Sequence, residues 1–154
     1  NKIYQEISQE KGRVFAEVKK IYLKQLPIKV ISLEKQKYFG EKADEMLAFH
    51  EKIQSLKNRF LRRVQNSFAI EKMSRKLQFF YNHNFRTFVL ELKKLKIKLS
   101  LKEQDVWDDY YLEYKGEIDS LKMNIAATNK AIDAAIYELY DLTEEEIKVV
   151  EKKM

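Results

Sequence analysis

The side chains that could carry out chemistry are few, and their spacing argues against an active site. The chain has two histidines, His50 and His83, and no cysteine, which excludes a thiolate metal site. Five carboxylates lie between Asp105 and Glu117, but they share a helical repeat with aromatic residues and fit the solvated face of that helix. We therefore predict no catalytic residue, no bound cofactor and no metal ion in this chain.

Two Glu-x-Lys triplets match half of a metal-dependent nuclease motif. They are Glu17-Val18-Lys19, which has no aspartate anywhere before it, and Glu113-Tyr114-Lys115. The second triplet falls in a predicted helix, where residues two apart point about 200° away from each other. The three glycines, Gly12, Gly40 and Gly116, are isolated, which excludes a glycine loop that cradles phosphate. Neither nuclease nor nucleotide-binding chemistry is indicated.

Cationic side chains carry the stronger signal. Residues 1–100 hold 23 Lys/Arg and 10 Asp/Glu, whereas residues 101–154 hold 7 and 14, so the two parts have opposite net charge. The basic part either faces a polyanion such as nucleic acid or neutralises the acidic part across a helix pair. The first interpretation predicts that phosphates of duplex DNA are bound by Lys19, Lys20, Lys24, Lys52, Arg59, Arg62 and Arg63.

The last four of these cations fall on the first of two long predicted helices. Ser32 can cap a helix that begins at Leu33, and apolar residues keep helical spacing to about Asn66. Ser100 and Glu103 form a capping box, after which apolar residues alternate four and three apart from Trp107 to Leu139. That heptad seam, which runs through Tyr111, Tyr114, Ile118 and Leu121, calls for a partner helix.

Shorter elements are predicted between and after the long helices. Residues 71–81 and 85–95 show two helical patterns, with Asn84 as an N-cap, and Thr143 with Glu146 repeats the capping box before a short terminal helix. The fold class is therefore mainly α: a long, coiled-coil-like antiparallel hairpin with a small helical cap at its tip.

The first 31 residues differ from the rest of the chain. They are rich in β-branched and aromatic residues, and Pro27 pushes Leu26 towards extended geometry. We predict a short extended or β segment at the N-terminus and two units, residues 1–31 and 32–154. The sequence has no apolar run near 18 residues and no signal-peptide pattern, so we expect a soluble, cytoplasmic chain without a membrane partner.

Several stretches resemble the C-terminal end of adenine-specific DNA methyltransferases fused into Type II restriction-modification enzymes. Residues Phe15–Ile28 resemble the close of the target recognition domain of that family. Leu33–Gln36 and Ala43–Leu47 are similar to the helix that leaves this domain, and a comparable pattern occurs in Type I specificity subunits. Lys98–Gln104 and Ile132–Ile147 look like the closing helix and tail of the family.

The chain also departs from that family. Lys29 stands where the family often has a second proline, and Asp141 where it often has a glycine that ends the helix in the left-handed conformation. Neither an Asn-Pro-Pro-Tyr methyl-transfer motif nor a glycine-rich cofactor motif occurs in the chain. The resemblance therefore implies a non-catalytic module that carries the end of target recognition plus a helical spacer.

What the resemblance implies for the parent protein goes further. The parent would be an adenine-specific DNA methyltransferase or a restriction endonuclease, with S-adenosylmethionine as its cofactor and its methyltransferase domain upstream of Asn1. The alternative is a helical scaffold or dimerisation protein with no nucleic-acid role. The basic residues 1–100 favour DNA, and the acidic long helix favours neither, so a homodimer stays open.

Overall fold

The computed structural model describes residues 29–152, and this part of the chain is helical with no strand. The prediction of a mainly α fold is therefore confirmed. The predicted extended segment falls almost entirely on residues 1–28, which lie outside the described residues, as do Lys19, Lys20 and Lys24.

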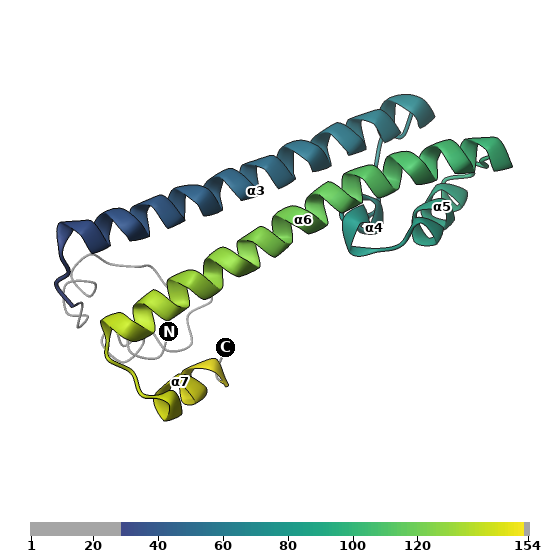
Figure 1. The fold of residues 1–154 in the computed structure, drawn as a ribbon. Helices are drawn as coiled ribbons and strands as arrows, with labels where there is room; N and C mark the ends of the chain where they lie inside the picture. The colour runs from purple at the N-terminus through teal and green to yellow at the C-terminus, as the bar shows by residue number, and fades with distance from the viewer. Residues whose placement is uncertain (1–28, 153–154) are drawn as a thin grey trace, which may run out of the picture.

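Two long helices dominate the structure. They are α3, Leu33–Phe68, and α6, Leu101–Leu139, which pack against each other and run in opposite directions (Figure 1). The remaining elements are α4 (Arg75–Gln78), the 3₁₀ helix η1 (Phe80–Asn82), α5 (Phe85–Lys94) and α7 (Glu144–Glu151). The elements α4, η1 and α5 gather at the end where α6 begins, and α7 lies at the opposite end (Figure 1).

The helix starts follow from side chains that satisfy free backbone N–H groups. The Ser32 hydroxyl accepts from the N–H of Lys35, and the Ser100 and Thr143 hydroxyls accept from the N–H groups three residues on. Ser100 and Thr143 belong to complete capping boxes, because the carboxylates of Glu103 and Glu146 accept in return from the cap residues' N–H groups. Both capping boxes were predicted from the sequence, and both are confirmed.

The predicted helix over residues 71–81 is wrong. The chain is irregular up to Ser74, whose hydroxyl caps the single-turn helix α4, and the helix stops at Phe79 before η1 begins. Tertiary contacts hold the broken form. Leu77 and Phe80 are both almost fully buried, and the Tyr111 hydroxyl of α6 donates to the carbonyl oxygens of Phe80 and His83 beside the break.

The hydrophobic core lies where α3 and α6 meet the shorter elements. Phe60 is fully buried at its centre, with its ring stacked on Phe80 at 3.8 Å and on Tyr110 at 5.6 Å between centroids. Aromatic pairs of this kind contribute beyond the area that they bury. The core is made by Leu56, Phe60, Val64, Ile70, Met73, Leu77, Phe80, Phe88, Val89, Leu92, Tyr111, Tyr114, Ile118 and Leu121.

Tyr111 ties α6 to the irregular stretch around η1. Its hydroxyl lies 2.8 Å from the backbone carbonyl oxygens of both Phe80 and His83, to which it donates. The ring is 1% exposed, and burial raises the pKa of Tyr111 to about 12. The group therefore stays a neutral donor, which adds a second hydrogen bond to the Phe80 carbonyl, already bonded by the His83 N–H, and also bonds the His83 carbonyl.

Three helices end in a residue with left-handed backbone that is not glycine. These residues are Ala69 after α3, Lys96 after α5 and Asp141 after α6, with φ angles of 49°, 63° and 53°. An L-residue pays roughly 1–2 kcal/mol for this conformation. At position 141 the structure thus shows the left-handed helix end that the resemblance associates with glycine.

Ala69→Gly should raise the free energy of unfolding by about 1 kcal/mol, because glycine adopts the left-handed conformation without strain. Ala69 is exposed, so the lost methyl group costs no packing. The matched control is Ala48→Gly at an exposed position inside α3, which should lower stability by about 1 kcal/mol. Urea unfolding measures both, and two changes of the same sign would contradict this assignment.

Candidate nucleic-acid interface

The predicted phosphate-binding residues that the structure describes are Lys52, Arg59, Arg62 and Arg63. All four lie on α3, and all four are exposed. They sit away from the buried stripe of Leu56, Phe60 and Val64, since each α-helical residue turns the side chain by about 100°. Burying one face of α3 against α6 therefore leaves these cations in solvent.

The structure brings the three arginines together. Arg59, Arg62 and Arg63 line one polar hollow of about 290 Å³ with Asn66 of α3 and with Tyr110 and Tyr114 of α6. We call this hollow the arginine pocket. Lys52 does not line it, because it lies seven residues before Arg59, about 10 Å along the helix axis. It lies on the same flank of α3, because seven residues make nearly two full turns.

Aromatic packing fixes the wall of the arginine pocket. The rings of Tyr110 and Tyr114 lie 4.7 Å apart, and both contact the buried ring of Phe60 next to Arg59. The guanidinium of Arg59 lies over the Tyr114 ring at 5.7 Å, within the range of a cation–π contact. The arginine is thus held at the junction of the two helices rather than left free in solvent.

The Tyr114 hydroxyl is a neutral group that hydrogen-bonds to Tyr110. Burial raises the pKa of Tyr114, and hydrogen bonding to Tyr110 raises it further, whereas the nearby Arg59 lowers it. The net shift is upward, so the hydroxyl is protonated at neutral pH. The arginine pocket therefore combines three permanent positive charges with neutral O–H and amide donors, a set that suits an anion with several oxygens.

The charges of the arginine pocket are not neutralised within the part of the chain that the structure describes. No carboxylate in residues 29–152 lies within 4.0 Å of the guanidinium groups of Arg59, Arg62 or Arg63, whereas several lysines elsewhere form such pairs. A guanidinium presents two parallel N–H donors that match the oxygens of a phosphate. Three guanidinium groups without a carboxylate partner among the described residues therefore line one hollow, and their paired N–H donors match the geometry of phosphate oxygens.

A second hollow continues on the outer face of α3. Arg59 and Arg62 line it together with Ser55 and other polar residues, and its volume is about 520 Å³. Its one carboxylate belongs to Glu51. The cationic surface thus extends from the arginine pocket around α3, which suits a backbone of successive phosphates better than a single small anion.

Part of the arginine pocket was missed by the sequence reasoning. The tyrosines were assigned to the seam, and Tyr114 is indeed 5% exposed, but the half-buried Tyr110 also forms the wall of the arginine pocket. Asn66 was not considered. Arg63 and Asn66 follow Arg59 by four and seven residues, which places all three on one face of the helix. This spacing could have identified Asn66 as part of the arginine pocket.

Within residues 29–152 no group of three or more His, Cys, Asp or Glu side chains could hold a metal ion. His50 is exposed on α3, and His83 lies in the cap, where its carbonyl accepts from Tyr111. Of the acidic cluster, Asp105, Asp109, Glu113 and Glu117 are exposed.

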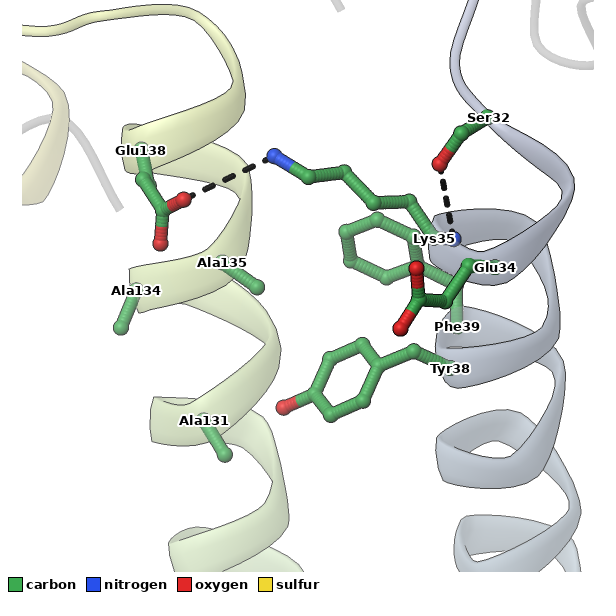
Figure 2. Close-up of a pocket in the computed structure, with 9 residues that line it drawn as sticks. All are labelled: Ser32, Glu34, Lys35, Tyr38, Phe39, Ala131, Ala134, Ala135 and Glu138. Carbon is green, nitrogen blue, oxygen red and sulfur yellow. Dashed lines mark hydrogen bonds and ion pairs between the residues drawn. The ribbon is translucent and has the colours of Figure 1, made fainter.

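The opposite end of the helix pair is looser. There a groove is lined by Tyr38 and Phe39 of α3 and by Ala131, Ala134 and Ala135 of α6, and the side chains of Lys35 and Glu138 approach across it to 3.6 Å (Figure 2). Apolar residues at this end are only half-buried, in contrast to the core around Phe60. No helix among the described residues is long and apolar enough to cross a membrane.

Comparison with known proteins identifies one family. Its model, described as a domain of unknown function (DUF8810), matches residues 32–136, which covers α3, the shorter elements and nearly all of α6. Neither the curated proteins nor the solved structures contain a significant match. Since the match spans more than half of the sequence and includes every residue of the arginine pocket, the chain belongs to the DUF8810 family.

Proposed function

We propose that this chain is a non-catalytic module that contacts duplex DNA mainly through phosphates. The observation that carries the proposal is the arginine pocket, in which Arg59, Arg62 and Arg63 meet without a carboxylate partner among the described residues. Phosphate contacts supply most of the non-specific affinity of DNA-binding proteins and fix their position on the duplex. The chain would therefore position DNA rather than read its sequence.

The geometry supports phosphate contacts over base contacts. The arginines lie at the junction of α3 and α6, where the wall formed by Tyr110 and Tyr114 limits how deeply this flank of α3 could enter a groove of the duplex. The bases would also have to reach Tyr110 past the guanidinium groups that flank it. A duplex that lies along the flank of α3 places its phosphates on the arginine pocket and on Lys52.

We further propose that the parent protein is a restriction-modification DNA methyltransferase, a proposal that rests on the family resemblance. Residues 1–31 would then close its target recognition domain, and residues 32–154 would form a coiled-coil-like antiparallel hairpin that acts as a spacer. The start of the family match at residue 32 supports that division. The upstream domain would bind S-adenosylmethionine, and modification of cellular DNA would place the protein in the cytoplasm.

A helical scaffold or dimerisation protein is the second candidate. The observation that favours it is the half-buried apolar end of the helix pair, where Tyr38 and Phe39 line an open groove (Figure 2). Such a groove suits another helix. This function needs no positive surface on α3, so salt-dependent DNA binding separates the two candidates.

DNA binding by the unmodified chain should depend steeply on salt. The four cations on the flank of α3 would neutralise about four phosphates, which gives a log–log slope near −3.6 and a Kd of roughly 10⁻⁴ to 10⁻⁶ M. Fluorescence anisotropy with a short labelled duplex at several salt concentrations measures both values. Absence of binding at low ionic strength would leave the scaffold function as the better account.

A further inference from the structure

A second basic surface lies outside the arginine pocket. Residues 69–99, which we call the cap, contain eight Lys/Arg and two Glu. All eight cations are exposed. Among these eight, Lys94 alone pairs with a carboxylate of the described residues, that of Glu91. The cationic residues of the cap are Lys72, Arg75, Lys76, Arg86, Lys93, Lys94, Lys96 and Lys98.

The two carboxylates of the cap differ, because Glu71 is exposed whereas Glu91 is buried. Glu91 is 6% exposed, and its oxygens accept from the Ser74 hydroxyl at 2.7 Å and from the Lys94 ammonium at 2.6 Å. These hydrogen bonds, first from Lys94 and then from Ser74, lower the pKa of Glu91. Glu91 therefore acts as an internal tie between α4 and α5, and Glu71 is the one exposed carboxylate of the cap beside its eight exposed cations.

The cap has a hollow of its own. Lys76 of α4 and Lys93 and Lys94 of α5 line it together with Thr87 and Leu90, above the buried Glu91, and its volume is about 390 Å³. The lysines thus converge from two helices rather than following a single stretch of sequence. Lysine ammonium groups bind phosphates as point charges, whereas the Thr87 hydroxyl already donates to the Asn84 side chain at 2.9 Å.

The cap and the arginine pocket lie on opposite sides of the α3–α6 pair. The cap packs against the side where Lys57 lies 4.2 Å from the Phe79 ring and where the Lys115 ammonium donates to the Tyr81 carbonyl at 2.8 Å. Arg59 follows Lys57 by two residues, so its side chain points about 200° away around α3. The helix pair therefore stands between the two basic surfaces.

We infer that the cap binds a second segment of duplex DNA, so that the module bridges two duplexes. The cap packs on the side of the helix pair opposite the arginine pocket, so a single short duplex seated on the flank of α3 would have to reach around the helix pair to contact it. This goes beyond the positioning of one duplex proposed above. The two surfaces share no residue, so either can fail in an experiment without the other.

The test uses three proteins and two short duplexes, one with a donor dye and one with an acceptor dye, mixed at low salt. The cap variant carries Lys72→Gln, Lys76→Gln and Lys93→Gln, which leaves the Glu91–Lys94 pair intact. The control variant removes the same charge from exposed positions outside the cap, through Lys37→Gln, Lys130→Gln and Lys148→Gln. The unmodified chain is the reference.

We expect energy transfer between the duplexes with the unmodified chain and with the control variant. With the cap variant the transfer should fall to that of the protein-free mixture, while anisotropy still reports binding of one duplex. For binding of the second duplex, the slope of log affinity against log salt concentration should become less steep by about 2.7, because three phosphate contacts are lost. Circular dichroism must show the same helix content in all three proteins.

Two outcomes overturn the inference. The first is undiminished energy transfer with the cap variant, which would place the second duplex elsewhere or attribute bridging to self-association of the chain. The second is an equal loss with the control variant, which would mean that total charge rather than the cap matters. Failure of the proposed function looks different, because Arg59→Gln, Arg62→Gln and Arg63→Gln together would then leave duplex binding unchanged whatever the cap does.

Discussion

Ile118→Asp is expected to destabilise the protein by several kcal/mol. Ile118 lies in the middle of α6, is 0% exposed and belongs to the hydrophobic core. An aspartate there would be buried without a partner, and burying an unpaired charge is among the most costly single substitutions. Urea unfolding followed by circular dichroism measures the effect, and a variant that does not fold at all agrees with it.

The matched control is Leu112→Asp on the same helix. Leu112 is 56% exposed, so its change should cost only about 1 kcal/mol, from lower helix propensity and from repulsion by Asp108 and Asp109. The pair separates the loss of a core contact from any general effect of a new carboxylate on α6. An Ile118→Asp protein as stable as the Leu112→Asp protein would show that the packing of α6 against α3 is misassigned.

Loss of the three arginines is expected to remove most of the DNA binding on the flank of α3. Arg59→Gln, Arg62→Gln and Arg63→Gln together should change the salt slope from about −3.6 to about −0.9, because three of four phosphate contacts disappear. Between 50 and 200 mM salt, affinity should then fall about 3.5-fold rather than about 150-fold. Anisotropy titrations at four salt concentrations measure both slopes.

The comparison is made in chains that also carry the three cap substitutions, so that only the flank of α3 reports binding. The charge-matched control again exchanges Lys37, Lys130 and Lys148 for glutamine, and it should keep the steep slope. Stability should change by no more than about 1 kcal/mol in any of these proteins, since all the exchanged residues are exposed and Arg59 loses only its cation–π contact with Tyr114. An unchanged slope in the arginine variant would remove the arginine pocket from the account.

The long helices could be predicted from the sequence because their signals are local. Serine caps, capping boxes and apolar periodicity depend on residues within a few turns, and α3 and α6 begin at the residues that these signals indicate. Gly40 has the lowest helix propensity of any residue in α3, yet the helix continues through it. Extension of the helix on both sides stabilises the turn by more than one glycine costs.

The cap could not be predicted as well, because distant contacts decide its form. Helical periodicity over residues 71–81 competes with the burial of Leu77 and Phe80 and with the two carbonyls that Tyr111 satisfies from α6. A local sequence pattern cannot show that the Tyr111 hydroxyl, 31 residues after Phe80, donates a hydrogen bond to the Phe80 carbonyl. Tertiary contacts therefore stabilise two short elements, α4 and η1, where the local sequence pattern predicts one helix.

The candidate site, too, was predictable from the sequence only in part. The exposure of Arg59, Arg62 and Arg63 follows from their angular separation from the apolar stripe, and it was predicted. Their convergence with Tyr110 and Tyr114 depends on the register between α3 and α6, which a single sequence does not fix. The cap lysines were not proposed for DNA binding, because their grouping needs the packing of α4 against α5.

The most direct measurement is site-specific crosslinking of DNA to α3. The chain has no cysteine, so a single Ser55→Cys next to Arg59 and Arg62 can carry a photoactivated crosslinker without altering any cation. The control is Ser120→Cys, an exposed position on α6 beside Asp119. We expect salt-sensitive crosslinks to a duplex from position 55 and few from position 120. Equal crosslinking from both positions, or none from position 55, would contradict the assignment of the α3 flank to DNA phosphates.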